Sequence, residues 1–136
     1  MAYGRLEGVN ASYKDMAAIC RNIKGMTIDE AIDFLNKVLD KKAAVLYPRW
    51  NRKMAHRKKG QRITNLNTPK GRFPQKESML MIGLLKSVKA AAEAKSIDGK
   101  IIHAAATKKQ IIRRWAPKGP VRRNDIELIR VEVVVG

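Results

Sequence analysis

The sequence predicts an α+β fold, with three helices followed by a long, protruding antiparallel β-hairpin, in one domain of 136 residues. Three observations predict it. Helix-capping residues followed by apolar residues at helical spacing begin at Ser12 and at Thr27, and a third helical pattern follows Pro74. Beyond Asp98 and Gly99 the pattern becomes extended and rich in β-branched residues. The length fits a single domain, because domains cluster at roughly 100–150 residues.

The first two helices begin at recognisable caps. Ser12 can accept a hydrogen bond from an amide of the first turn, and Asp15 is predicted to complete a capping box with it. Gly25 supplies the left-handed residue that ends this helix. Thr27 and Glu30 repeat the capping pattern at the start of the second helix.

The third helix is predicted over residues 75–95, because Pro74 lies where a helix can start. Its apolar face is predicted to contain Met79, Ile82 and Leu85.

The second and third helices are joined by a basic loop, residues 42–73, with almost no periodic apolar pattern. A loop of this length is uncommon in a compact domain unless it is functional or bound to a partner.

The remaining sequence predicts a hairpin over residues 101–135, with its tip at about residues 113–123. Pro117, Gly119 and Pro120 mark the reversal, because proline fixes φ and glycine can adopt positive φ. Arms of about 14 residues extend roughly 45 Å, which is longer than so small a domain can cover. The outer half is therefore expected to project. A basic two-stranded ribbon is marginal in water, so we expect a polyanion to surround it.

Positive charge is concentrated in two stretches of the sequence. Residues 41–76 contain twelve Lys and Arg, residues 100–123 contain eight, and neither stretch contains an acidic residue. The rest of the chain has 9 basic and 12 acidic residues, so the net charge of +17 arises wholly from these stretches. A polyanion relieves such charge best, and nucleic acid releases counterions when Lys and Arg neutralise its phosphates. The sequence therefore predicts a nucleic-acid-binding protein.

The residue types in these stretches favour RNA. Tyr47 and Trp50 alternate with arginines, and Trp115 follows Arg114. Aromatic rings stack on unpaired bases while guanidinium groups pair with phosphates, which suits folded RNA with loops and bulges. For Tyr47 and Trp50, anchoring the loop in the core is an equally good interpretation. The candidate RNA-binding residues are Arg49, Trp50, Arg52, Lys53, His56, Arg57, Lys58, Lys59, Arg62, Lys70, Arg72, Lys108, Lys109, Arg113, Arg114, Lys118, Arg122 and Arg123.

The sequence contains no pattern for a metal site, a cofactor or catalysis. Cys20, His56 and His103 are too few for a Cys/His metal site, and Cys20 is interpreted as a small buried residue. No phosphate-cradling glycine loop, nucleophile elbow or helix-borne histidine pair occurs. No run approaches the roughly 20 apolar residues of a membrane-spanning helix. We expect no enzymatic activity, no cofactor and no membrane insertion.

Four strings in the sequence resemble a known family. They are Ala-Ala-Ile-Cys-Arg-Asn-Ile-Lys-Gly-Met (17–26), Asp-Glu-Ala (29–31), Gly-Arg-Phe-Pro (71–74) and Ile-Ile-His-Ala-Ala (101–105). Over nearly its whole length the chain resembles the universal large-subunit ribosomal protein called L twenty-two in bacteria and L seventeen in eukaryotes. The likeness is closer to the archaeal and eukaryotic branch.

The resemblance implies three helices packed on a small three-stranded antiparallel sheet, whose first strand would lie around residues 5–11. It implies a structural protein of the large ribosomal subunit in the cytoplasm, which binds and organises ribosomal RNA and contacts neighbouring large-subunit proteins. The hairpin tip would line the nascent-peptide exit tunnel and face the nascent polypeptide. The tip residues so implied are Trp115, Ala116, Pro117, Lys118, Gly119 and Pro120. This tip departs from the Arg-Ala-x-Gly-Arg-Ala type that is usual in the family.

Two other interpretations compete with this one. A free DNA- or RNA-binding regulator would insert the basic β-ribbon into a groove, and would form a sequence-selective complex with a short duplex at physiological salt. A ribosomal protein would instead co-sediment with large subunits. An enzyme acting on RNA would need turnover that depends on Glu30 or His103.

Overall fold

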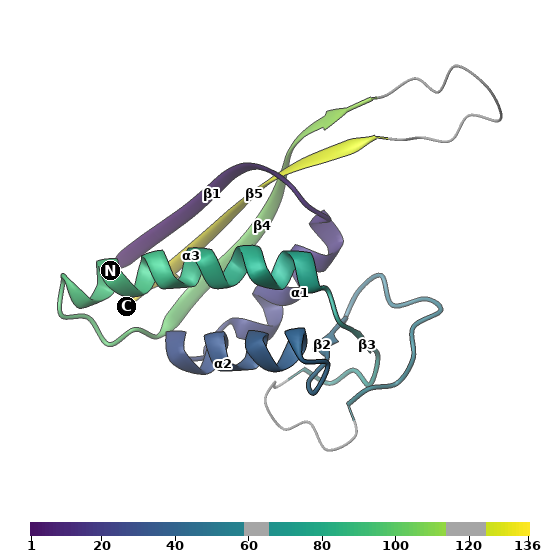
Figure 1. The fold of residues 1–136 in the computed structure, drawn as a ribbon, viewed down its shortest axis with the longest axis horizontal. Coiled ribbons are helices and arrows are strands. Elements are labelled where there is room, and N and C mark those ends of the chain that lie inside the picture. The colour runs from purple at the N-terminus through teal and green to yellow at the C-terminus, as the bar shows by residue number, and fades with distance from the viewer. Residues whose placement is uncertain (59–65, 114–124) are drawn as a thin grey trace.

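The computed structural model describes residues 1–58, 66–113 and 125–136, and it has the predicted α+β fold (Figure 1). Its main sheet has three antiparallel strands, and a separate two-stranded ribbon joins the ends of the basic loop. In chain order the elements are β1 (Ala2–Asn10), α1 (Tyr13–Ile23), α2 (Ile28–Leu39), β2 (Val45–Leu46), β3 (Gly71–Arg72), α3 (Gln75–Glu93), β4 (Ile101–Ile112) and β5 (Ile126–Val135).

The main sheet has the strand order β1-β5-β4. In the central strand β5, Ile129, Val131, Val133 and Val135 are buried and alternate with partly exposed residues, as expected when one face of a sheet is covered. The predicted three-stranded sheet is confirmed. Its first strand starts earlier than predicted, because Ala2 already pairs with Val135.

Helices α1 and α3 cover one face of the sheet, and α2 packs against α3 (Figure 1). Fully buried side chains from all three helices, such as Ile19, Leu35 and Leu85, form one core with the sheet. We call the three helices and the part of the sheet that they cover the body of the molecule. Strand β1 approaches α3 closely at Gly4, where a Cβ atom would lie 2.2 Å from Cγ2 of Val88. Cys20 is buried in this core as predicted, and its burial raises the pKa of its thiol to about 12.

The predicted capping box of α2 is confirmed, whereas that of α1 is half formed. Thr27 Oγ1 accepts from the Glu30 amide at 3.3 Å, and Glu30 Oε2 accepts from the Thr27 amide at 3.0 Å. At α1, Ser12 Oγ accepts from the Asp15 amide at 3.5 Å. The Ser12 amide, however, donates to Glu77 Oε1 at 3.1 Å. The prediction that Asp15 completes this box is therefore wrong, because a carboxylate of α3 takes its place.

Helix α3 buries part of the face that was predicted: Leu85 is buried and Ile82 packs against the core, but the assignment of Met79 to this face is wrong. Met79 is 63% exposed, whereas Met81, Leu85 and Val88 are buried. At about 100° per residue, Met79 lies opposite this buried face. The apolar residues of α3 lie on several sides of the helix, so packing against β1 and α2 selects the buried face, and helical spacing alone does not. None of the helices in the described residues is both long enough and apolar enough to cross a membrane.

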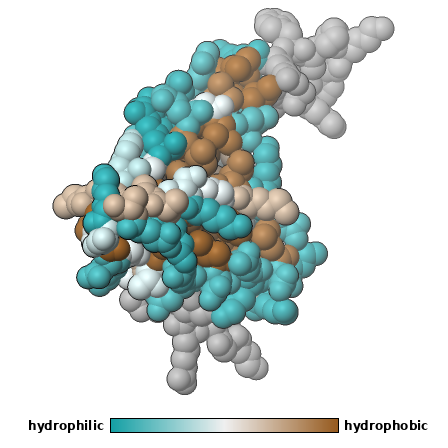
Figure 2. Space-filling model, turned by 60° about the vertical axis from the view of Figure 1, so that its left-hand side comes forward, coloured by the Kyte–Doolittle hydropathy of each residue, from teal (hydrophilic) through white to brown (hydrophobic). Residues whose placement is uncertain are grey.

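Strands β4 and β5 stay paired out to Ile112 and Ile126, beyond Leu128, where the pairing of β5 with β1 ends at Asn10. We call the outer part of this pair, residues 108–113 and 125–128, the stalk. It leaves the body of the molecule in Figure 1, and Figure 2 shows hydrophobic residues near its outer end. The predicted reversal at residues 116–120 lies outside the described residues.

Candidate RNA interface

The basic loop is attached to the body through its two ends, which form a short ribbon. Leu46 of β2 pairs with Gly71 of β3, and His56 forms an isolated bridge with Lys70. The Tyr47 amide donates to the Lys70 carbonyl at 2.9 Å. The ends of the loop are therefore ordered by backbone pairing, although the sequence shows no periodic pattern there.

A buried asparagine of α1 fixes the start of this ribbon. Asn22 is 2% exposed, and its Nδ2 donates to the carbonyls of Ala18 at 2.7 Å and Leu46 at 2.9 Å. Its Oδ1 accepts from the Leu46 amide at 3.1 Å. One side chain thus satisfies both backbone groups of Leu46 and joins β2 to α1.

Tyr47 is a core anchor. Its side chain is 1% exposed, and its hydroxyl donates to Asp15 Oδ1. Burial, together with this hydrogen bond to a carboxylate, raises the pKa of Tyr47 well above its ordinary value. Of the two interpretations left open for Tyr47, anchoring is therefore confirmed.

Trp50 has a different environment, although it is only three residues further along the chain. Its side chain is on the surface, with 39% exposure, and its backbone has a φ of +54°. The Tyr13 ring contacts it edge-on, with ring centroids 5.7 Å apart and an interplanar angle of 68°. Trp50 is thus held against α1 but leaves part of the indole open to solvent.

Most of the predicted loop cations in the described residues are exposed. Lys58 and Lys70 are half-buried. The exposed cations are Arg49, Arg52, Lys53, Arg57 and Arg72, and His56 is also exposed. Within the described chain, none of these cations forms an ion pair with a carboxylate. The Arg57 guanidinium lies 4.8 Å from the ring centroid of Phe73, and Lys58 Nζ donates to the Leu66 carbonyl at 2.6 Å. Their charges are therefore available to an external anion.

The stalk cations differ, because two of the three described ones have acidic partners. Lys108 Nζ lies 2.8 Å from Glu127 Oε1, and Lys109 Nζ lies 3.1 Å from Glu7 Oε1. The hydrogen bond from Lys108 lowers the pKa of Glu127. Arg113, which follows the last residue of β4, is exposed. Carboxylates thus offset part of the repulsion that was expected across a basic ribbon.

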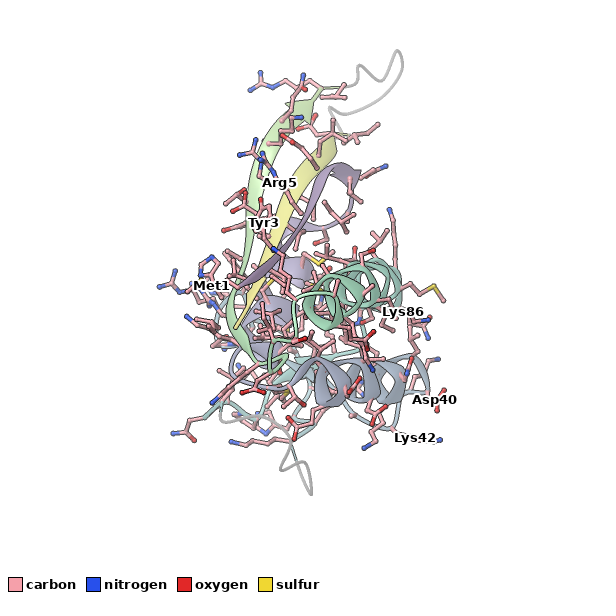
Figure 3. All side chains as sticks on the ribbon, turned by 90° about the vertical axis from the view of Figure 1, so that its left-hand side faces the viewer. Met1, Tyr3, Arg5, Asp40, Lys42 and Lys86 are labelled. Atoms are coloured by element: carbon pink, nitrogen blue, oxygen red, sulfur yellow. The ribbon has the colours of Figure 1, made fainter. Side chains whose placement is uncertain are left out.

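The uncovered face of the sheet carries an ion-pair network around Glu7. Arg5 Nη2 lies 3.2 Å from Glu7 Oε2, and Arg5 Nε lies 3.6 Å from Glu132 Oε1. Arg130 Nη2 lies 2.8 Å from Glu7 Oε1. Hydrogen bonds from Arg130 and then Lys109 lower the pKa of Glu7 to about 2. Figure 3 shows Arg5 pointing away from the helices. The cations on this face are therefore largely neutralised inside the protein, unlike those of the loop.

Several predicted residues lie outside the described part of the chain. They are Lys59 and Arg62 of the loop, Arg114, Lys118, Arg122 and Arg123 of the hairpin, and the tip residues Trp115, Ala116, Pro117, Gly119 and Pro120. Their roles stay predictions.

The described parts of the two basic segments lie at the same end of the molecule. In Figure 1 the loop and the stalk both extend from the end where α1 begins, and the two chain termini lie at the opposite end. Near those termini, where α2 begins and α3 ends, a pocket of about 370 Å³ is lined by Asp29, Glu93 and Asp98, among others. In the described residues no group of three or more His, Cys, Asp or Glu side chains is placed to hold a metal ion. Lys89 also lines this pocket, and its Nζ lies 2.6 Å from Asp29 Oδ1. Exposed loop cations without carboxylate partners thus lie at one end of the described chain, whereas the carboxylates at the other end have a cation among them.

Three residues that shape this interface were missed in the sequence. Asn22 carried a signal, because it is a polar residue on the apolar stripe of α1 beside Ile19 and Ile23. Asp15 was interpreted as a capping residue, and Tyr13 had no pattern that distinguished it.

A family model described as "Ribosomal protein L22p/L17e" matches residues 5–135 of this chain. The chain belongs to this family. Membership confirms the resemblance read from the four strings, and with it the prediction of a structural protein that is not an enzyme. It favours a ribosomal protein over a free regulator.

Archaeal members of the family are similar to this chain over most of their length. The large ribosomal subunit protein uL22 of Methanocella arvoryzae is 35% identical, over 94% of this chain and 84% of the relative. That of Sulfolobus acidocaldarius is 30% identical, over 100% of this chain and 89% of the relative. That of Aeropyrum pernix is 39% identical, over 83% of this chain and 73% of the relative. The predicted link to the archaeal branch agrees with these relatives.

Proposed function

We propose that this chain is a structural constituent of the large ribosomal subunit, in the cytoplasm, and that its basic loop and stalk bind and organise ribosomal RNA. The observation that carries the proposal is the group of exposed loop cations that have no carboxylate partner in the described chain. Arg49, Arg52, Lys53 and Arg57 are exposed without carboxylate partners in the described chain. At the other end, by contrast, Lys89 is paired with Asp29 beside Glu93 and Asp98. The basic end therefore faces RNA, and the opposite end is left to solvent and neighbouring large-subunit proteins.

Binding at the basic end acts mainly through phosphate neutralisation. Each phosphate contact made by Lys or Arg releases condensed counterions. On a duplex this adds roughly 0.9 to the steepness with which log affinity falls against log salt, and on a single strand it adds less. The Phe73 contact holds the guanidinium of Arg57 before binding, and the ribbon of β2 and β3 fixes the backbone of Arg72. Less side-chain freedom is then lost when a phosphate is bound.

The proposal is tested by two charge reversals of equal size. Arg52→Glu changes an exposed loop cation, and Lys86→Glu changes an exposed cation of α3 (Figure 3). We expect Arg52→Glu to weaken binding to large-subunit ribosomal RNA and to lower the salt slope by about 1, with a much smaller effect of Lys86→Glu. Equal losses from the two variants would mean that only net charge matters, and would contradict an interface at the basic end.

We further propose that the hairpin tip lines the nascent-peptide exit tunnel, with residues 115–120 facing the nascent polypeptide. This part rests on the family resemblance and on the stalk, which leads away from the body toward the tip. Deleting residues 118–121 is expected to leave the thermal unfolding and the RNA affinity of the protein nearly unchanged while altering the passage of some nascent chains through reconstituted ribosomes. If the deletion unfolds the isolated protein, the tip belongs to the body and this placement is wrong.

A further inference from the structure

Trp50 is a partly exposed tryptophan in the middle of a cationic surface. The side chain has 39% exposure, and Arg49, Arg52 and Lys53 next to it in the chain are also exposed. The exposed part of the indole offers a flat aromatic surface to a partner. A partner that covers it would bring apolar or aromatic surface into a region that repels cations and attracts anions.

The position of the indole is fixed before any partner binds. Tyr13 packs against it at 5.7 Å between ring centroids, and Tyr13 belongs to the first turn of α1. The Asn51 side chain donates to the Tyr47 carbonyl at 3.2 Å, which ties the next residue to the buried anchor. Trp50 and Lys53 also have positive φ, at +54° and +57°. Non-glycine residues keep this conformation where the surrounding structure determines it.

The same pair of rings links the loop to the stalk. Lys108 Nζ lies 5.5 Å from the Tyr13 ring centroid, and Glu127, the ion-pair partner of Lys108, accepts from the Tyr13 amide at 3.4 Å. The Glu127 carboxylate repels an incoming phosphate. Lys108 is nevertheless 41% exposed, and an ammonium has three donors, so it can bind a phosphate and its present partner together.

We propose that Trp50, supported by Tyr13, is a stacking platform for one unpaired base of the bound RNA, and that Arg49, Arg52 and Lys108 neutralise the phosphates on either side of that base. This inference rests on the proposed function, and it adds the class of nucleotide that the site accepts. A nucleotide is the partner that brings an aromatic face together with negative charge. A paired base within a helix has no free face, so the site selects a loop, a bulge or a strand end.

The test uses the tryptophan content of the chain. There are two tryptophans, Trp50 and Trp115, so the Trp115→Phe variant reports on Trp50 alone. Three RNAs of equal length are titrated into it: a single strand, the same strand with abasic residues, and a duplex. We expect the normal single strand to quench Trp50 fluorescence in parallel with binding measured by anisotropy. The abasic strand and the duplex are expected to bind through phosphates with little quenching.

Substitution of Trp50 gives an independent measurement. Trp50→Ala is expected to weaken binding of the single strand about 5- to 150-fold, while Trp50→Phe keeps most of the affinity, because stacking needs only an aromatic face. The salt slope is expected to stay the same in these variants, since no charge is removed. Circular dichroism checks whether each variant is folded. If Trp50→Ala is unfolded, the affinity of Trp50→Phe and the quenching data decide whether Trp50 stacks on a base.

Two outcomes would overturn the stacking site. One is equal quenching by normal and abasic strands, and the other is unchanged affinity of a folded Trp50→Ala variant for the single strand. Failure of the broader RNA-binding proposal looks different, because none of the three RNAs would then bind the parent protein and Arg52→Glu would have no effect.

Discussion

The body of the molecule and the basic loop differ in the contacts that hold them. In the body, Ile19, Leu35, Leu85 and Val133 are fully buried from four different elements, so many small apolar contacts share the stabilisation. In residues 47–58, Tyr47 is the one buried side chain, and the loop is positioned by individual contacts: hydrogen bonds, the Trp50–Tyr13 ring contact and the Arg57–Phe73 contact. Burial of apolar side chains therefore stabilises the body, whereas the conformation of the loop depends on a few separate contacts and, in our proposal, on RNA.

The largest effect is expected from a cavity in the body. Leu85→Ala removes a fully buried side chain of α3 and should lower the free energy of unfolding by about 3–5 kcal/mol in denaturant titrations. Met79→Ala on the same helix is the matched control, because Met79 is 63% exposed, and it should change the stability by no more than about 0.5 kcal/mol. If the two variants lose equal stability, the observed buried face of α3 is wrong.

The next effect sharpens the comparison at the loop anchor. Asn22→Ala leaves the amide and carbonyl of Leu46 without their side-chain partner in a buried site, and we expect a loss of about 2 kcal/mol. Because Asn22 positions β2, RNA affinity should fall as well, even at temperatures where the variant is folded. Leu85→Ala, measured under conditions where it is folded, should retain its RNA affinity. RNA affinity that is unchanged in Asn22→Ala would show that the loop does not need this anchor.

The same contrast explains what could be predicted from the sequence. The structure of the body could be predicted where the signal is local, as at the Thr27 and Glu30 capping box. It could not be predicted where a distant residue replaces the local partner. The Ser12 amide, for example, donates to Glu77, which is 65 residues away in the chain. The role of Tyr47 depends on Asp15, 32 residues away, and that of Asn22 on Leu46, 24 residues away. Periodicity carries no information about such pairs. Charge content, by contrast, identified the basic segments directly, because it does not depend on tertiary contacts.

The dependence of stability on alkaline pH distinguishes the two regions, because each contains one buried side chain that ionises at high pH. Burial raises the pKa of Cys20 in the body from 9.0 to about 12, and it also raises the pKa of Tyr47 in the loop anchor above 10.0. Each group is protonated in the folded state at pH values where it ionises in the unfolded chain. Its contribution is therefore complete below the unfolded pKa and decreases as the pH rises, by up to about 1.4 kcal/mol per pH unit.

We expect the free energy of unfolding to fall from about pH 9 and more steeply above pH 10. Cys20→Ala should remove the earlier part of this decrease, and Tyr47→Phe should remove the later part. The measurement is a set of urea titrations between pH 8 and pH 11. An unchanged alkaline slope in Tyr47→Phe would contradict the burial of that hydroxyl.

The smallest effect on stability is expected in the stalk. Lys108→Met removes the partner of Glu127, whose pKa is lowered in the folded protein, so the pair stabilises above the unfolded pKa of about 4.5 and this contribution is lost as the pH falls below it. Since the side chains are 41% and 35% exposed, solvent screening should limit the loss at pH 7 to less than about 1 kcal/mol. Near pH 3 the variant and the parent should differ even less. The salt slope of RNA binding should nevertheless decrease, because a proposed phosphate contact is removed. A stability loss above about 2 kcal/mol with an unchanged salt slope would instead mean that Lys108 serves the fold, and the stalk would then have to be grouped with the body rather than with the loop.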